Sequence, residues 1–306
     1  MASLIRQIVG HQTQVRDFLS AVHGRRLGSA YMLVGPSGIG KKTLAIALAH
    51  LLACESQSGC GHCLGCKQYE FGMCLVAPDG ASIKIDQARD ILQFLNLRSQ
   101  GKFRIVIVDQ VQLMVAQAAN ALLKTLEEPP PGTLFLLISP SPSGVLSTIR
   151  SRCQVVRFEA LSPQELMQIA NLPEWVAHAA GGSLETATQL NQPEVQELRH
   201  LAITTLLDFT THTPQFLFTS WRESFKDRSE AIRICRLWLG FVRDALVLRV
   251  NGDSGFIRNQ DLRSDIFALS QFQSLEVLAE RLGAFELELK SRDVVLAFEE
   301  LALRSL

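Results

Sequence analysis

Short hydrophobic runs alternate with longer amphipathic segments along the first half of the chain. Four of the runs have the length and the apolar content of strands buried on both faces of a sheet. They cover residues 30–34, 103–108, 134–138 and 154–158. Three segments between them have the length and apolar spacing of helices, and these cover residues 41–53, 86–96 and 113–127. The alternation predicts an α/β domain with a parallel sheet, the architecture of many nucleotide-binding domains.

After the last of these runs the strand pattern disappears and helical patterns follow. Ser162 and Pro163 are typical of a helix start, with a capping residue and then proline at the first helical position. Further along, Trp238, Phe241 and Ala245 recur at helical spacing on an apolar stripe. This favours packing in a core or subunit interface over a platform for stacking nucleic-acid bases. The predicted domains are an α/β domain (1–158), a small helical domain (159–192) and an all-α domain (193–306).

Charge and hydropathy exclude several classes of protein. The 306 residues include 30 Lys and Arg and 30 Asp and Glu, so the formal net charge is zero. Without an overall basic field, any contact with DNA has to be local. No apolar run approaches the roughly 18 residues of a membrane span, so we expect no membrane association. The beginning of the chain lacks the apolar core and cleavage site of a signal peptide, and we therefore expect a cytoplasmic protein.

The segment GPSGIGK at Gly35–Lys41 matches the first seven positions of the phosphate-loop pattern GxxxxGK[ST]. It stands between a predicted strand and a predicted helix, where backbone N–H groups bind phosphate and Lys41 reaches the outer phosphates. The eighth position should carry a hydroxyl for Mg²⁺, but it is Lys42, and Thr43 lies about 100° further round the helix. We therefore expect phosphate binding, with ATP as a candidate ligand, without metal-dependent hydrolysis. The candidate nucleotide-binding residues are Gly35, Ser37, Gly38, Gly40, Lys41, Lys42, Thr43 and Asp109.

Asp109 directly follows the hydrophobic run 103–108. It takes the place of a Walker-B aspartate, which holds Mg²⁺ in phosphate-loop enzymes. In ATPases of this broad class a glutamate follows, and it activates the attacking water. Here the next residue is Gln110, whose neutral amide cannot accept the proton of that water. A second position needed for hydrolysis is thus altered. The alternative role for Asp109 is to cap the following helix.

Four of the seven cysteines lie within thirteen positions, at Cys54, Cys60, Cys63 and Cys66. Four thiolates form a closed tetrahedral Zn²⁺ site, which is structural because no position remains for water. An iron–sulfur cluster and unligated thiols are the alternatives. The segment 54–66 therefore predicts a structural zinc module, inserted directly after the phosphate-loop helix, that a partner could contact.

Several motifs occur together in one order. They are the phosphate loop, the four-cysteine insertion, SIKIDQAR at 82–89, AANALLKTLEEPP at 118–130 and TIRSRC at 148–153. In this order they resemble the bacterial clamp-loader family of AAA+ proteins, over about residues 1–160. The resemblance implies an AAA+ phosphate-loop domain, a helical lid domain and a C-terminal collar domain that joins the subunits of a hetero-pentameric ring.

The same resemblance implies a function and partners. Such a ring uses ATP to open a sliding clamp and to place it on primer–template DNA during DNA replication. The implied partners are therefore the other clamp-loader subunits, gamma/tau and delta, of DNA polymerase III. The sliding clamp and primed DNA would be reached through the complex.

The resemblance also implies roles for single residues. Arg152, in the SRC segment, corresponds to an arginine finger that reaches a phosphate bound by a neighbouring subunit; pairing with a local carboxylate is the alternative. Ser139 stands at a polar sensor position, and Glu185 stands where a sensor arginine would be, although a carboxylate there repels phosphates. These departures favour a subunit that does not hydrolyse ATP itself. The alternatives are an active clamp-loader ATPase of the gamma/tau or replication-factor-C kind, and a zinc-containing nucleotide-binding protein unrelated to replication.

Overall fold

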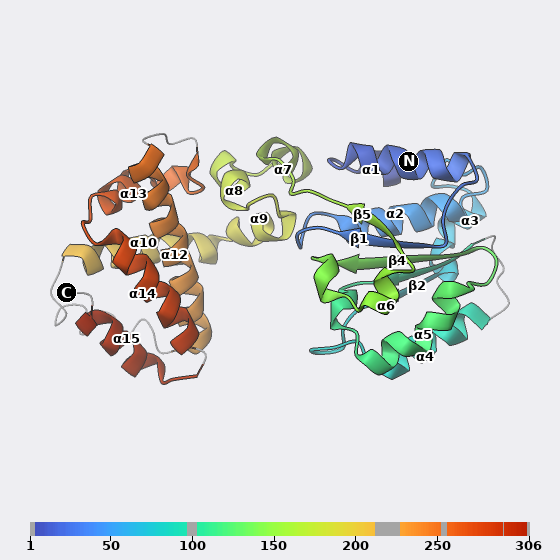
Figure 1. Ribbon diagram of the computed structural model, residues 1–306. Helices are drawn as coiled ribbons and strands as arrows, with labels where there is room; N and C mark the ends of the chain where they lie inside the picture. The colour runs from blue at the N-terminus through green and yellow to red at the C-terminus, as the bar shows by residue number, and fades with distance from the viewer. Residues whose placement is uncertain (1–3, 97–102, 212–226, 252–255, 290, 305–306) are drawn as a thin grey trace. The chain divides into compact units, whose positions relative to one another are not determined.

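The computed structural model describes residues 4–96, 103–211, 227–251, 256–289 and 291–304 (Figure 1). The chain forms two compact units. Unit 1 comprises Met1–Ala170 and Gly182–Glu185, and unit 2 comprises Asn171–Gly181 and Thr186–Leu306. The division into three domains at residues 158 and 192 stays a prediction.

A five-stranded parallel sheet forms the centre of unit 1, in the order β2-β3-β4-β1-β5 (Figure 1). The strands are β1 (Ala30–Val34), β2 (Met73–Val76), β3 (Arg104–Val108), β4 (Thr133–Ser139) and β5 (Gln154–Arg157). Every residue of β1 and β4 is buried, as expected for parallel strands covered on both faces. All four hydrophobic runs are strands, to within one residue at each end, and the parallel α/β prediction is confirmed.

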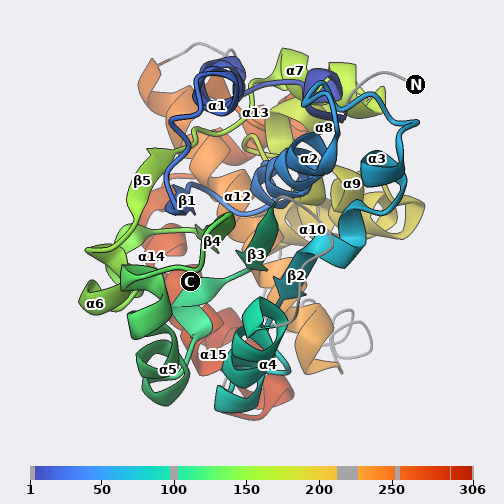
Figure 2. The ribbon, with the colours of Figure 1, turned by 90° about the vertical axis from the view of Figure 1, so that its right-hand side faces the viewer.

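Helices cover both faces of the sheet (Figure 2). Alternate strand residues, including Met32, Val106 and Phe135, form one hydrophobic cluster with α4 (Ile85–Asn96) and α5 (Ala116–Glu127). The helix α2 (Lys41–Ala53) packs on the opposite face, and nine of its thirteen residues are buried. Its small alanine side chains allow this close approach to the sheet. The helix predicted over 41–53 is confirmed at both ends.

The remaining elements of unit 1 are helices and 3₁₀ turns. They are α1 (Gln12–His23), α3 (Leu64–Lys67), α6 (Ser147–Arg150), α7 (Pro163–Ala170) and the 3₁₀ turns η1 (Leu4–Gln7), η2 (Tyr69–Gly72), η3 (Val111–Leu113) and η4 (Pro142–Gly144). The expected cap precedes α7. The Ser162 hydroxyl accepts a hydrogen bond from the Glu165 backbone N–H at 3.2 Å, and the Glu165 carboxylate accepts from Ser162 N–H at 2.7 Å. This reciprocal pair satisfies two N–H groups at the helix start.

Two elements differ from the sequence-based expectation. The strand β2 was not predicted, and only its last residue, Val76, is buried. The helix predicted over 113–127 begins at Ala116, because residues before it pair with a distant segment: Val115 N–H donates to the Ile83 carbonyl at 3.1 Å, and Met114 forms a parallel bridge with Ile83. A non-local pairing of this kind leaves no local pattern.

In the described residues of unit 2, every regular element is a helix. Its elements are α8 (Glu174–Ala179), the larger part of α9 (Leu184–Leu190), α10 (Pro193–Thr211), α12 (Arg228–Asn251), η6 (Gln260–Leu262), α13 (Arg263–Ser270), α14 (Leu275–Glu288) and α15 (Val294–Arg304). Trp238, Phe241 and Ala245 are fully buried in its hydrophobic core, and the Trp238 indole donates to the Ala202 carbonyl at 2.7 Å. These residues therefore pack in a core, as predicted. Among the described residues, none of the helices combines the length and the hydropathy of a membrane span.

A buried arginine joins α8 to the longer helices of unit 2. The Arg199 guanidinium lies 3.9 Å from the ring centroid of Trp175, and it donates to both oxygens of Asp261 at 3.0 and 3.1 Å. A cation taken out of water needs such partners on several sides. This contact explains why residues 171–181 belong to unit 2 although α7, just before them, belongs to unit 1.

Candidate functional site

The phosphate loop connects the end of β1 to the start of α2. Gly35 N–H donates to the Ser139 carbonyl at 3.3 Å, which ties the loop to the end of β4. Gly40 precedes α2 with a φ of 94°, in the left-handed region that glycine adopts without strain. The loop therefore lies at the carboxyl ends of parallel strands and at a helix N-terminus, where α/β folds bind phosphate.

Lys41 is buried at the base of this loop, with 6% of its surface exposed. Its ammonium donates to the Gly35 carbonyl at 2.6 Å and also to the Pro36 carbonyl. Burial lowers the pKa of Lys41, and the nearby Asp109 carboxylate opposes that effect. The side chain thus lies in the loop, where it would reach bound phosphate.

Lys42 forms an ion pair with Asp109, with Nζ and Oδ2 at 3.3 Å. The Lys42 ammonium therefore lies against the carboxylate that would bind Mg²⁺ in a phosphate-loop ATPase. Thr43, the nearest hydroxyl in the sequence, is exposed while Lys41 is buried, so the two point to different sides of the helix. The residues present do not fit a Mg²⁺ site, because a cation occupies the place of its hydroxyl ligand and already pairs with its carboxylate.

Gln110 and Ser139 occupy the other two positions expected to act in hydrolysis. Gln110 is exposed and adopts a left-handed conformation, with φ 54°. Ser139 is fully buried, and its hydroxyl donates to the Ser141 carbonyl at 2.7 Å. Neither side chain supplies a carboxylate that would accept a proton from water.

A segment distant in sequence packs directly on the loop. Leu184 N–H donates to the Gly38 carbonyl at 2.8 Å. A Cβ at Gly38 would lie 2.2 Å from the Ser183 hydroxyl and 2.8 Å from Glu185 Cβ, so only glycine fits there. Glu185 is thus placed beside the loop, at the position where the sequence resemblance led us to expect a sensor, and its side chain is exposed.

The four cysteines of the insertion come together at the end of α2. Their sulfurs lie within 4.8 Å of one another, with Cys60 and Cys66 Sγ at 3.8 Å and Cys54 and Cys63 Sγ at 4.0 Å. In a tetrahedral zinc site with Zn–S bonds of about 2.3 Å, the sulfurs lie about 3.8 Å apart. The donor set and its spacing therefore fit Zn²⁺.

Backbone geometry explains how the cysteines meet. Cys54 directly follows the last residue of α2, and α3 carries Cys66. A Cβ at Gly65 would lie 1.9 Å from the Ala53 carbonyl oxygen, so glycine is required for the two helices to approach. In addition, Cys66 N–H donates to Cys63 Sγ at 3.4 Å, a contact that favours a thiolate.

The surroundings of each thiol in the cluster, including the other thiols, shift its pKa. Burial opposes ionisation of Cys54, but hydrogen bonds from the Ser56 hydroxyl and from the backbone of Cys60 and Ser58 lower its pKa to about 4. Burial and the neighbouring cluster thiols raise the pKa of Cys66 to about 12. Four thiolates at this spacing repel one another, and a bound cation removes that repulsion.

Arg152 lies just after α6 and faces the end of α5. Its Nε donates to the Glu127 carboxylate at 2.7 Å, Nη2 contacts the same oxygen, and Nη1 donates to the Thr148 carbonyl at 2.7 Å. The side chain is 30% exposed and that of Glu127 is 48% exposed. The local ion pair that the sequence left as an alternative is thus present, at a surface position where a second partner can approach the guanidinium.

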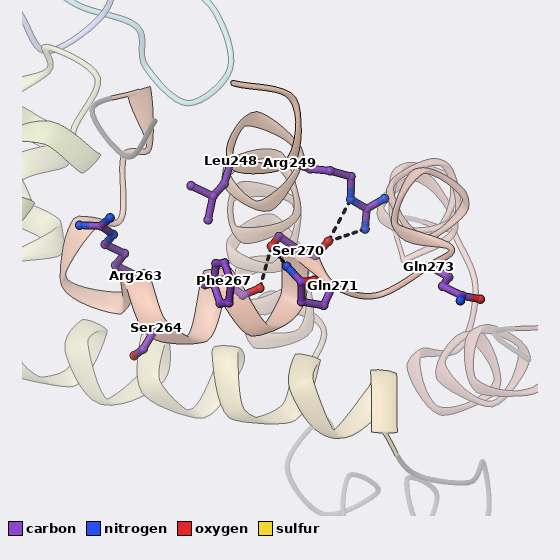
Figure 3. A pocket seen from close by; sticks show the side chains of 8 residues that line it. All are labelled: Leu248, Arg249, Arg263, Ser264, Phe267, Ser270, Gln271 and Gln273. Atoms are coloured by element: carbon purple, nitrogen blue, oxygen red, sulfur yellow. Dashed lines mark hydrogen bonds between the residues drawn. The ribbon is translucent and has the colours of Figure 1, made fainter. Parts of the chain in front are cut away.

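The helical unit contains a surface pocket of about 860 Å³. Figure 3 shows Arg249 directed at Ser270, whose carbonyl accepts from Nε at 2.9 Å and from Nη2 at 2.7 Å. The lining residues are Leu248, Arg249, Arg263, Ser264, Phe267, Ser270, Gln271 and Gln273. This lining includes no cysteine, histidine or carboxylate, so its two serines have no general base among the lining residues to activate them.

Sequence comparisons identify relatives of this chain. The profile of a family described as "DNA polymerase III, delta subunit" matches residues 10–162. The delta' subunit of DNA polymerase III from Pseudomonas aeruginosa is 35% identical over 56% of this chain and 58% of that protein. The delta' subunit from Bacillus subtilis is 29% identical over 81% of this chain and 80% of that protein. The tau subunit from Escherichia coli is 32% identical over 61% of this chain, but the match spans only 32% of tau.

Among solved structures, a gamma subunit-related protein of DNA polymerase III from Thermotoga maritima aligns with 96% of this chain and 97% of its own. Its TM-score is 0.45 and its sequence identity is 16%. This structural similarity is too weak to establish a relationship, so the family of this chain is identified from the sequence matches alone.

Proposed function

Because the chain belongs to the DNA polymerase III delta-subunit family, a clamp-loader family with the AAA+ fold, we propose that it acts as a delta-prime-like subunit. In this role it binds gamma/tau and delta in a hetero-pentameric ring and helps to load the sliding clamp on primed DNA during replication. It does not hydrolyse ATP, and it supplies Arg152 to the ATP site of a neighbouring subunit. It is thus a subunit of a DNA polymerase rather than an ATPase in its own right.

The Lys42–Asp109 ion pair is the observation that carries this proposal. Hydrolysis on a phosphate loop needs a metal between the phosphates and a positioned water. Here an ammonium stands in the place of the metal ligand, and Gln110 cannot take up the proton of the water. The loop keeps the shape of a nucleotide site without these two functions.

The surroundings of Arg152 support its role as a finger in trans. An exposed ion pair such as Arg152–Glu127 contributes only about 0–1 kcal/mol, so its exchange for a phosphate costs little. The guanidinium forms bidentate contacts with phosphate oxygens, and it stabilises the charge that develops in phosphoryl transfer. Glu127 and the Thr148 carbonyl hold the side chain in place until the neighbour presents its nucleotide.

For the cysteine cluster, the geometry supports a structural zinc site. Four sulfur ligands leave no open position, so this zinc would hold α3 against the end of α2 without taking part in a reaction. The module would stabilise a surface of the AAA+ domain that another subunit contacts.

The finger is tested by Arg152→Ala in the reconstituted clamp loader. We expect unchanged assembly and a several-fold lower ATPase rate with clamp and primed DNA. The matched control is Arg89→Ala, since Arg89 is another exposed arginine of unit 1 and pairs with Asp86 at 2.8 Å. If the two variants had the same rate as the wild-type complex, the role of Arg152 would be refuted.

The competing proposal is an active ATPase subunit, which the similarity to the tau sequence favours. It predicts that the isolated chain, given clamp and primed DNA, hydrolyses ATP at a rate that falls on Lys41→Ala. Our proposal predicts no turnover above background for either protein.

A further inference from the structure

The phosphate loop contains its own counter-ion. We infer that it binds the diphosphate group of a nucleotide without Mg²⁺, with the Lys42 ammonium in the place of the metal. This inference rests on the proposed function, in which the loop does not hydrolyse ATP.

The loop offers backbone donors for such an anion. In the described part of the chain, the N–H groups of Gly38, Ile39 and Gly40 donate no hydrogen bond to protein. Gly38 and Gly40 adopt left-handed conformations, with φ 73° and 94°, on either side of Ile39. Successive N–H groups in turns of this kind form a concave anion site. The contact from Leu184 uses the Gly38 carbonyl, so it leaves these donors unused.

The side chains at the loop include two cations, Lys41 and Lys42. Two carboxylates also lie near the loop: Asp109 pairs with Lys42, and the exposed Glu185 lies beside Gly38. In a metal-dependent loop, Mg²⁺ offsets the charge of this aspartate and bridges the phosphates. Here Lys42 already offsets it at 3.3 Å, and its side chain stays 43% exposed, so its ammonium can also contact a bound phosphate.

Mg²⁺ would oppose binding at this site. A nucleotide that arrives as its Mg²⁺ complex brings the metal next to the Lys42 ammonium, and the two cations repel each other. The carboxylate that would hold the metal is already paired. The metal-free nucleotide therefore fits the loop better than the magnesium complex does.

The test is a calorimetric titration of ADP into the full zinc-loaded chain, in Mg²⁺ and in EDTA. We expect the wild-type chain to bind ADP in EDTA at least as tightly as in Mg²⁺. Lys42→Thr restores the missing hydroxyl and frees Asp109, so its binding should become at least about tenfold tighter in Mg²⁺ than in EDTA. The control Lys42→Met removes the ammonium without adding a ligand, and it should bind weakly in both buffers. Inorganic pyrophosphate, titrated in parallel, shows whether the diphosphate alone suffices or the nucleoside is needed.

Three results would overturn the inference. They are wild-type binding that requires Mg²⁺, Lys42→Thr binding that stays independent of Mg²⁺, and no binding of ADP or pyrophosphate by the wild-type chain in either buffer. None of these results changes the expected effect of Arg152→Ala in the assembled complex. The two proposals therefore fail separately.

Discussion

The two ends of α2 differ in the way they treat metal ions. At its N-terminus, one lysine stands where a metal-binding hydroxyl is expected, and it pairs with the carboxylate that would share the metal. At its C-terminus, Cys54 directly follows the same helix and supplies one of four sulfurs at tetrahedral spacing. The backbone of both sites is intact. The comparison shows that ligand chemistry, and not the shape of the chain, decides which end of the helix fits a metal.

The two ends of α2 also differ in role: the four cysteines have a structural role, and the phosphate loop has a ligand-binding role. A closed set of four sulfurs stabilises the chain and excludes water from the metal. A phosphate loop without its metal ligand still offers donors to an anion, but it cannot activate water. We therefore propose that zinc at the C-terminal end of α2 stabilises the insertion, and that the N-terminal end binds an anion without hydrolysis.

Removing two of the zinc ligands should have the strongest effect of the substitutions proposed for the two ends of α2. Replacing Cys60 and Cys63 together by serine should reduce bound zinc from one ion per chain to none and lower the stability of unit 1 by about 4 kcal/mol or more. Native mass spectrometry and thermal unfolding measure the two effects. Cys74→Ala is the control, because Cys74 lies in β2 and outside the cluster. Full stability of the double variant without metal would contradict the structural role.

A second substitution tests how the two helices meet. Gly65→Ala places a Cβ against the Ala53 carbonyl, so the backbone must shift and the sulfurs with it. We expect zinc affinity to fall about tenfold to hundredfold, the range seen when support of a metal site is lost. Gly240→Ala is the matched control, since a Cβ there meets nothing within 4 Å. Equal zinc affinity in both variants, measured by competition with a chelator, would show that the close contact is unimportant.

A third substitution tests the role of Asp109 at the N-terminal end of α2. Asp109→Asn removes the carboxylate that faces Lys42, so the ammonium is released to a bound phosphate. In EDTA, ADP should bind about threefold to tenfold tighter, as expected for loss of one partly exposed negative charge. In a metal-dependent site the same change would weaken ADP binding in Mg²⁺. Calorimetry in both buffers therefore distinguishes the two outcomes: our account predicts that Asp109→Asn does not weaken binding in Mg²⁺.

The Lys42–Asp109 ion pair should contribute little to the stability of the folded chain. Lys42 is 43% exposed, and exposed ion pairs contribute about 0–1 kcal/mol. Lys42→Thr should therefore change the free energy of unfolding in urea by less than about 1 kcal/mol. A larger loss would mean that Lys42 is a structural residue, and its effect on nucleotide binding would then need another explanation.

Much of the fold could be predicted because its signals are local. The buried strands are continuous apolar runs, and α2 follows a glycine-rich loop that marks its start. The strand β2 lacks such a run, since it is short and only Val76 is buried. The late start of α5 depends on the contact of Val115 with Ile83, which lies more than thirty residues earlier.

In the candidate site, too, the local features could be predicted from the sequence and the features that depend on tertiary contacts could not. Spacing alone indicated the cysteine cluster, whose ligands are close in sequence. The pairing of Arg152 with Glu127 was foreseen only as an alternative, because a salt bridge between residues 25 positions apart depends on the packing of α5 against α6. Likewise, the contact of Leu184 with Gly38 joins segments that only the tertiary fold brings together.

Whether the loop binds a nucleotide without metal can be seen in a crystal structure of the full chain grown with ADP and Mn²⁺, with the manganese located by its anomalous scattering. Mn²⁺ takes the oxygen ligands that Mg²⁺ takes. We predict a diphosphate in the loop at Gly35–Lys41, the Lys42 ammonium against it, and no manganese beside Asp109. Manganese bound between Asp109 and the phosphates, with Lys42 displaced, would contradict the account.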